Sequence, residues 1–186
     1  MSKHIDYEIN KELGECYLFM GEFEKAVSYY EKAAECSTDK ADPYLGMAAI
    51  AMQLGKFEEA EKRYLSAIAV EPIDKSYAGL ALAEVELKKH DSAFEHIEKA
   101  LQINPTNLVG LNTLVQLGYA TSRLEDVLPK LRGSLAVQDN EVVRFALAGC
   151  LSSLGQTENA RKELEVLLGK NPENERAQEL YARLAA

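Results

Sequence analysis

The stretch from Gln53 to Pro72, QLGKFEEAEKRYLSAIAVEP, decides the fold, because recognisable copies of it recur along almost the whole chain. Gly55 is placed to end one helix in the left-handed conformation, which glycine adopts at little cost. In the helix expected next, Ala60 and Tyr64 share one face, and charged residues fill the other. Pro72 predicts where that helix stops. The stretch is therefore one unit of a helical repeat.

The repeat has a period of 33 or 34 residues, counted between the residues that open the second helix of each unit: Ala26, Ala60, Ala93, Val127 and Ala160. The turn before that helix begins at Gly21, Gly55, Lys88, Ser122 and Gly155. A period this regular is typical of a solenoid, in which each unit packs on its neighbours. We therefore predict a single domain of five repeat units over residues 7–40, 41–73, 74–107, 108–140 and 141–172.

Two segments depart from the regular pattern. In the fourth unit, Pro129 and Gly133 interrupt the second helix, and an interior proline costs about 3 kcal/mol. If Asp126 caps this helix, Pro129 falls in its first turn, so we expect a late start or a local distortion. Residues 173–186 follow the spacing of a first helix and predict a capping helix with polar residues on its outer face: Glu175, Arg176, Gln178, Glu179 and Arg183.

The first unit resembles the tetratricopeptide repeat family. The residues that carry the resemblance fall where the family signature places them: Leu13, Gly14, Tyr17, Gly21, Phe23, Ala26, Tyr30 and Ala33. The resemblance extends over roughly residues 7–172. It implies an all-α fold, a right-handed superhelical solenoid of antiparallel helix pairs, with a concave groove in which partners bind.

Composition favours a folded protein and excludes several partners. Charged residues make up 27% of the chain and hydrophobic residues 47%, which argues against disorder. The formal charge of -9 repels phosphate backbones and anionic lipids, so nucleic acid is not an expected partner. We expect a cytoplasmic protein, because the start lacks the apolar core of a signal peptide, no run of about 18 apolar residues occurs, and the three cysteines lack a CxxC spacing.

No motif for catalysis, metal binding or a cofactor is present in the sequence. His4, His90 and His96 lack ligand spacing, and no glycine-rich phosphate loop or nucleophile elbow occurs. Cys16 and Cys150 occupy one repeat position, at which the other units carry apolar residues, so both are expected as small core residues. We therefore predict no catalytic residues, no metal site and no cofactor, and we interpret the chain as a protein that is not an enzyme.

The first helix of each unit has two faces. The packing face carries Leu13, Met47, Leu80, Leu114 and Leu147. The other face, at spacings of three and four residues, corresponds to the groove of the resembled family. We call it the groove stripe; it comprises Lys11, Glu15, Leu18, Leu45, Ala49, Met52, Leu82, Val85, Asn112, Gln116, Tyr119 and Phe145, with Ala78, Gly149 and Ser152 at the same spacing. Its middle is apolar, as protein contacts commonly are. The alternative is that curvature buries part of the stripe as core.

We interpret the chain as a scaffold or adaptor that binds an apolar or amphipathic segment of another protein. Two related alternatives are a self-assembling homo-oligomer, similar in architecture to magnetosome-associated tetratricopeptide proteins, and a chaperone similar to the type III secretion translocator chaperones, which usually carry three repeats. An enzyme is the alternative from a different class. The carboxylate grip of heat-shock co-chaperones is not expected, because only Lys11 matches, and the other four places carry Glu15, Gly46, Ser76 and Leu80.

Overall fold

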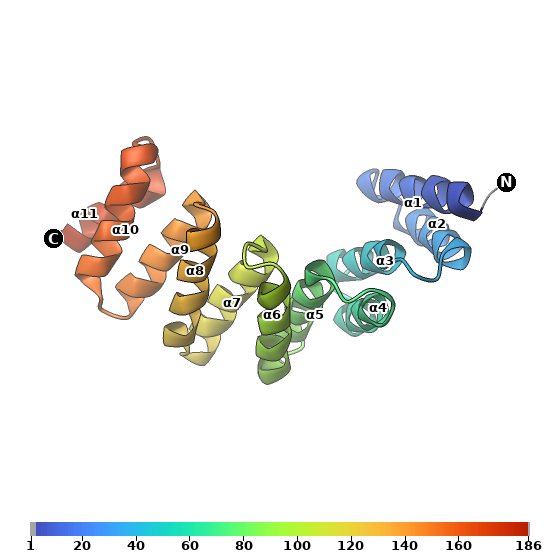
Figure 1. The fold of residues 1–186 in the computed structure, drawn as a ribbon, viewed down its shortest axis with the longest axis horizontal. Coiled ribbons are helices and arrows are strands. Elements are labelled where there is room, and N and C mark those ends of the chain that lie inside the picture. Colours follow the sequence, from blue (N-terminus) through green and yellow to red (C-terminus); the bar gives the residue numbers. More distant parts are fainter. Residues whose placement is uncertain (1–2, 186) are drawn as a thin grey trace. The chain divides into compact units, whose positions relative to one another are not determined.

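The computed structural model describes residues 3–185, which form eleven α-helices and no strand (Figure 1). The helices are α1 (Lys3–Phe19), α2 (Phe23–Cys36), α3 (Asp42–Gln53), α4 (Phe57–Val70), α5 (Asp74–Glu86), α6 (His90–Ile103), α7 (Leu108–Thr121), α8 (Leu124–Val137), α9 (Glu141–Ser153), α10 (Thr157–Lys170) and α11 (Glu175–Ala185). The prediction of an all-α fold is confirmed, and α11 is the expected eleventh helix.

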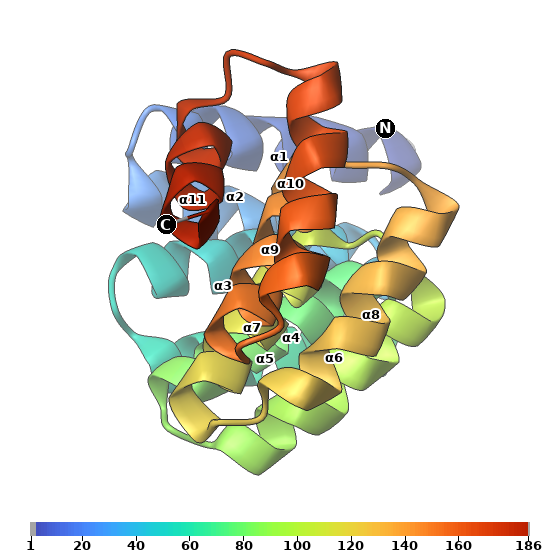
Figure 2. The same ribbon diagram turned by 90° about the vertical axis from the view of Figure 1, so that its left-hand side faces the viewer.

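Contacts between the helices divide the chain into an N-terminal half, which ends at Ile103, and a C-terminal half, which begins at Asn104. In the N-terminal half, α2 packs against α1 and α3, and α4 packs against α3 and α5. In the C-terminal half, α8 packs against α7 and α9, and α10 packs against α9 and α11 (Figure 2). Each of these second helices is therefore shared by two first helices, which is how a repeat buries an apolar face that it could not bury alone.

A left-handed residue closes the turn between the two helices of each repeat. Its φ angle lies between 56° and 76° at Gly21, Gly55, Lys88, Ser122 and Gly155. In each turn the N–H of the next residue donates to a carbonyl five residues back, as Lys89 does to Glu84 at 2.8 Å. This bond satisfies a carbonyl at the helix end. It maintains the turn even at Lys88 and Ser122, where a side chain makes the left-handed conformation cost about 1–2 kcal/mol.

Tyrosines of the second helices fit against glycines of the first helices. Tyr30 in α2 is 2% exposed, and a Cβ at Gly46 of α3 would lie only 2.3 Å from its ring carbon Cζ. A Cβ at Gly14 of α1 would lie 2.8 Å from the same ring. Tyr64 uses Gly79 of α5 in the same way, with a separation of 2.2 Å. The glycines thus make the room that these rings occupy between neighbouring helices.

The second helix of the fourth repeat begins at Leu124, so the prediction of a late start was wrong. Its first turn is locally different, because the N–H of Asp126 donates to the carbonyl of Arg123 three residues back, whereas in the other second helices the corresponding bond spans four residues.

Pro129 lies inside α8, which continues without a break to Val137. Proline lacks an N–H, so the carbonyl of Glu125 loses its helical donor. Both residues are exposed, and water can reach that carbonyl, which explains why the helix tolerates the proline.

Cys150 is buried as predicted, but Cys16 is exposed, contrary to the expectation that it is a core residue. The reason lies in the helix that covers this repeat position. Ile50, at the same position in α3, belongs to a buried cluster with Ala26 and Tyr30 of α2, the second helix of the preceding repeat. Among residues 3–185 no helix precedes α1, so Cys16 is not covered in this way.

Candidate functional site

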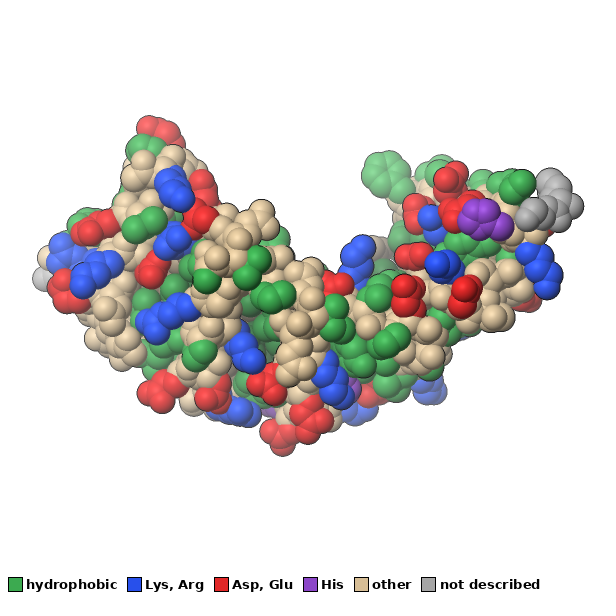
Figure 3. Space-filling model, viewed as in Figure 1, with side chains coloured by type: hydrophobic (Ala, Val, Ile, Leu, Met, Phe, Trp, Pro, Cys, Tyr) green, Lys and Arg blue, Asp and Glu red, His purple; other side chains and the backbone are tan. Residues whose placement is uncertain are grey.

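The apolar middle of the groove stripe lies on α3 and α5, two first helices that contact each other. Four of its side chains are partly exposed: Leu45, Met52, Leu82 and Val85. Leu45 and Met52 also pack against the buried cluster of α3, α4 and α5. Figure 3 shows hydrophobic side chains reaching the surface over this region. All four side chains therefore show apolar area to solvent, and Leu45 and Met52 contribute to packing as well.

The small residues at the same spacing differ in burial. Ala49 is partly exposed, whereas Ala78 is fully buried and belongs to the core, contrary to its assignment to the groove face. A single methyl group does not extend past the side chains around it. Ser76 and Leu80 stand at two of the places where heat-shock co-chaperones carry their carboxylate-binding residues, and both are 0% exposed. These two residues therefore cannot contact a peptide.

The polar end of the stripe lies on α1. The ammonium of Lys11 lies 3.1 Å from Glu8, and this hydrogen bond raises the pKa of Lys11. Glu15 is exposed and Leu18 is half-buried. Both line a cavity of about 560 Å³, together with Phe19, Gly21, Phe23 and Gln53. The structure thus brings Glu15 and Leu18 next to α3, whereas Lys11 is paired within its own helix.

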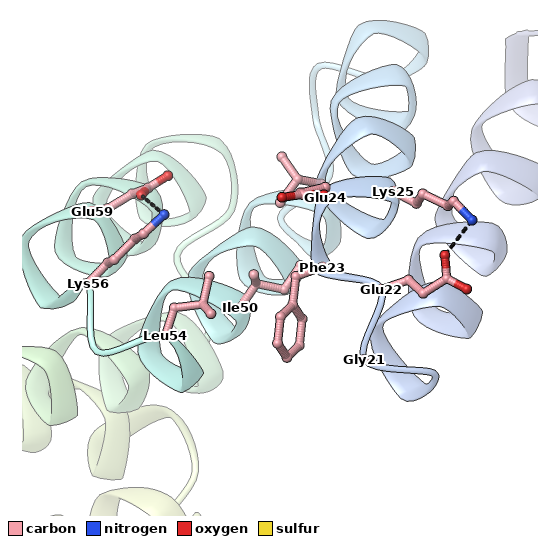
Figure 4. A pocket seen from close by; sticks show the side chains of 10 residues that line it. Gly21, Glu22, Phe23, Glu24, Lys25, Ile50, Leu54, Lys56 and Glu59 are labelled. Atoms are coloured by element: carbon pink, nitrogen blue, oxygen red, sulfur yellow. Dashed lines mark ion pairs between the residues drawn. The ribbon is translucent and has the colours of Figure 1, made fainter.

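A second cavity, of about 620 Å³, lies next to the first, because Gly21 and Phe23 line both. Phe23 at the start of α2 and Ile50 and Leu54 at the end of α3 supply its apolar wall (Figure 4). Two ion pairs also line it, Lys25 with Glu22 and Lys56 with Glu59. The repeat pattern did not predict this cavity, and the signal that marks it is an apolar residue, Leu54, directly before the turn glycine.

In the C-terminal half the residues of the groove stripe lie on α7 and α9. Asn112 and Gln116 are exposed on α7. The hydroxyl of Tyr119 lies 3.1 Å from Oγ of Ser153, so the Tyr119 ring reaches from α7 to α9. Phe145 is half-buried and packs against the core of α9, α10 and α11. The structure therefore places Tyr119 and Phe145 on the helices expected, with Phe145 partly in the core.

Helix α11 contributes site residues that the sequence analysis did not assign to the groove. Arg176, Glu179 and Arg183 line a cavity of about 430 Å³ with Phe145 and Leu180. They were expected on the outer face of the capping helix, but this side of α11 lies next to Phe145 of α9. The repeat period is the signal that would have placed them, because Glu179 follows Phe145 by 34 residues.

A buried carboxylate pairs with a histidine between α5 and α6. Nδ1 of His96 lies 2.8 Å from Oε2 of Glu84, which is 4% exposed. Burial raises the pKa of Glu84, and the contact with His96 opposes that rise. The pair joins α5 and α6. Among the described residues no third His, Cys, Asp or Glu is placed with it to bind a metal ion. Within residues 3–185 no group of three or more such side chains is placed to hold a metal ion.

Comparison with known families agrees with the repeat pattern and with the helix pairs. One model described as a tetratricopeptide repeat matches residues 18–83 and 119–184, and a second model of the same description matches residues 74–107. The matches cover well over half of the chain, so the chain belongs to the tetratricopeptide repeat family. The family resemblance of the first repeat is thereby confirmed. No helix formed by residues 3–185 is long and apolar enough to cross a lipid bilayer.

Individual relatives share the repeat architecture. RNA polymerase II-associated protein 3 of Mus musculus is 29% identical over 180 residues, which cover 93% of this chain and 26% of that protein. The structure of Pseudomonas aeruginosa pilF matches with a TM-score of 0.80 and 20% identity, over 100% of this chain and 85% of that chain. The first TPR of Spaghetti (RPAP3), bound to the HSP90 peptide SRMEEVD, matches with a TM-score of 0.59 and 24% identity, over 63% of this chain and 94% of that chain. This chain spans about a quarter or less of the first curated relatives that it matches.

Proposed function

We propose that this chain is a non-catalytic protein-interaction module that binds an apolar or amphipathic segment of another protein along the groove stripe of α3 and α5. The observation that carries the proposal is the partial exposure of Leu45, Met52, Leu82 and Val85 on two helices in contact. A bound segment would remove their remaining apolar area from water, which favours binding by about 25 cal/mol for each Å².

The surroundings of the stripe support this function. The cavity beside Glu15 and Leu18 includes Phe19, which is 95% exposed and offers a partner an aromatic contact. The N-terminal half contains 12 Lys and Arg against 20 Asp and Glu, so its field attracts a segment with basic residues beside the apolar ones. A relative in the same family, the first TPR of Spaghetti, is bound to a peptide, which supports a peptide as the ligand class.

Selection of random peptides displayed on phage, with the chain of residues 1–186 as target, tests the proposal. The enriched peptides should carry apolar residues at i, i+3, i+4 and i+7, the pattern of an amphipathic helix. Their affinities are then measured by fluorescence anisotropy. Met52→Lys combined with Leu82→Lys should weaken binding by about tenfold or more, because each new ammonium would have to be desolvated. The aliphatic stem of each lysine can still cover the core.

A matched control is Leu65→Lys, which makes the same chemical change at a side chain of α4 that is 48% exposed and lies outside the stripe. Leu80→Ala sets the scale for a core residue, at about 2–5 kcal/mol. If the double lysine variant melts as early as Leu80→Ala, the stripe is core and the proposal fails. If the selected peptides bind that variant as tightly as the wild type, the binding surface lies elsewhere.

A further inference from the structure

The cavity beside α11 combines an apolar floor with charged walls. Leu180 is 7% exposed and Phe145 is half-buried, and both belong to the packed helices α9, α10 and α11. Arg176, Glu179 and Arg183 line the same cavity, of about 430 Å³. Residues three, four and seven apart share one side of a helix, so the three charged side chains form a row along α11.

The two arginines of this row are not neutralised by the fold. Within residues 3–185 neither the Arg176 side chain nor the Arg183 side chain forms an ion pair or a hydrogen bond. Arg144 and Arg161 of the same half behave differently: each makes an ion pair, Arg144 with Glu163 and Arg161 with Glu158. The C-terminal half contains 9 Lys and Arg against 10 Asp and Glu, so its net charge hardly opposes an acidic ligand.

We propose that this cavity binds an acidic peptide segment of a partner protein, with an apolar side chain over Phe145 and Leu180 and one carboxylate on each arginine. At 1.5 Å per residue, Arg176 and Arg183 are about 10 Å apart along the helix axis. Side chains of an extended peptide alternate between two faces, so residues on one face are two or four positions apart, and four positions span about 13 Å at roughly 3.3 Å each. The segment that fits is therefore a pair of acidic residues four positions apart with an apolar residue midway between them, which places all three side chains on the face toward α11.

The side chains of α11 also set the specificity of the cavity. A guanidinium can bind a carboxylate through two parallel hydrogen bonds, so each arginine recognises an acidic end of the segment. Glu179 lies between the arginines and repels a third acidic residue at the centre of the segment. The cavity consists only of residues of α9 and α11, so this proposal stands or fails separately from binding at α3 and α5.

Fluorescence anisotropy with a labelled peptide, Gly-Ser-Glu-Ala-Leu-Ala-Glu-Ser-Gly, tests the proposal on the chain of residues 1–186. The chain should bind this peptide in low salt, and affinity should fall as salt is added. A peptide with Gln in place of both Glu should bind about tenfold more weakly or worse. Arg176→Gln combined with Arg183→Gln should cause a similar loss without changing the thermal melt, because both side chains are exposed. Glu179→Gln should tighten binding, an effect that a purely structural role does not predict.

Two controls separate the outcomes. Arg132→Gln removes an exposed arginine of α8 outside the cavity and should leave the affinity unchanged. Met52→Lys with Leu82→Lys should also leave it unchanged, since those residues belong to the groove stripe of the N-terminal half. The proposal is overturned if the chain of residues 1–186 does not bind the acidic peptide in low salt, or if Arg132→Gln weakens binding as much as the double arginine variant. It is also overturned if a single-stranded oligonucleotide competes with the peptide for the two arginines.

Discussion

Replacing Gly46 by alanine should destabilise the N-terminal half, although alanine is the better helix former. The new Cβ would lie 2.3 Å from Cζ of Tyr30, about 1 Å inside the 3.4 Å at which ordinary contacts begin. The ring cannot retreat toward α1, because it already lies close to Gly14, and it is 2% exposed. Overpacking of this kind costs about 1–3 kcal/mol, which exceeds the gain in helix propensity.

The same substitution at Gly133 should have the opposite effect. Gly133 lies in the interior of α8, and apart from its chain neighbours and the backbone of its own helix no atom lies within 4 Å of where its Cβ would be. Alanine therefore meets no obstacle and gains only helix propensity, about 0.5–1 kcal/mol. The two substitutions are chemically identical and both lie in helices, so their difference in sign isolates the contact with Tyr30.

Urea unfolding followed by far-ultraviolet circular dichroism measures both effects as shifts of the unfolding midpoint. Gly46→Ala should lower the midpoint and Gly133→Ala should raise it. A double-mutant cycle then tests the cause: with Tyr30→Leu in the background, Gly46→Ala should cost at least about 0.5 kcal/mol less than it does alone. The reasoning is refuted if Gly46→Ala raises the midpoint, or if its cost does not depend on the residue at position 30.

Two further predictions concern the C-terminal half. Pro129→Ala should stabilise α8 by up to about 3 kcal/mol, because it restores a helical hydrogen bond, and amide hydrogen exchange in α8 should slow; unchanged exchange would count against this. Hydrogen bonds from Lys170 and then Arg144 lower the pKa of Asp139 from its ordinary value of 3.8, so Asp139 contributes stability above pH 3.8 that is lost as the pH falls through the lowered pKa. The difference in stability between the wild type and Asp139→Asn should therefore shrink in acid, and a constant difference down to strongly acidic pH would disprove the contribution.

The repeat period was enough to predict the helices and their turns, for a reason visible at Lys88 and Ser122. These residues adopt the left-handed conformation without being glycine, because the hydrogen bond across the turn and the packing of the next helix determine the geometry. Prediction failed at positions where the neighbouring helices decide the burial or the conformation of a residue. Cys16 has the spacing of a core residue without a covering helix, and Pro129 is a helix breaker held in a helix by packing on both sides.

The spacing of the repeats indicates which positions belong to the candidate site. It does not indicate how much of each side chain is exposed to solvent. Spacing assigns a residue to a face of its helix, but side-chain length and the neighbouring helices decide how much of it reaches solvent. Ala78 and Leu82 share the spacing of the stripe, yet Ala78 is buried and Leu82 is partly exposed. The pairing of Glu84 with His96 carries no spacing signal, because it joins two helices across a turn.

If the groove stripe binds a partner as proposed, stability and binding are linked there. A side chain such as Met52 packs against the buried cluster and is also partly exposed to solvent. A substitution that shortens the side chain removes packing and contact area together, so a loss of binding would not identify the binding surface. A long side chain with a charged end separates the two effects, because its stem retains the packing while its charge opposes an apolar partner. The proposed ligand should in turn stabilise the N-terminal half, since it binds the folded helices and not the unfolded chain.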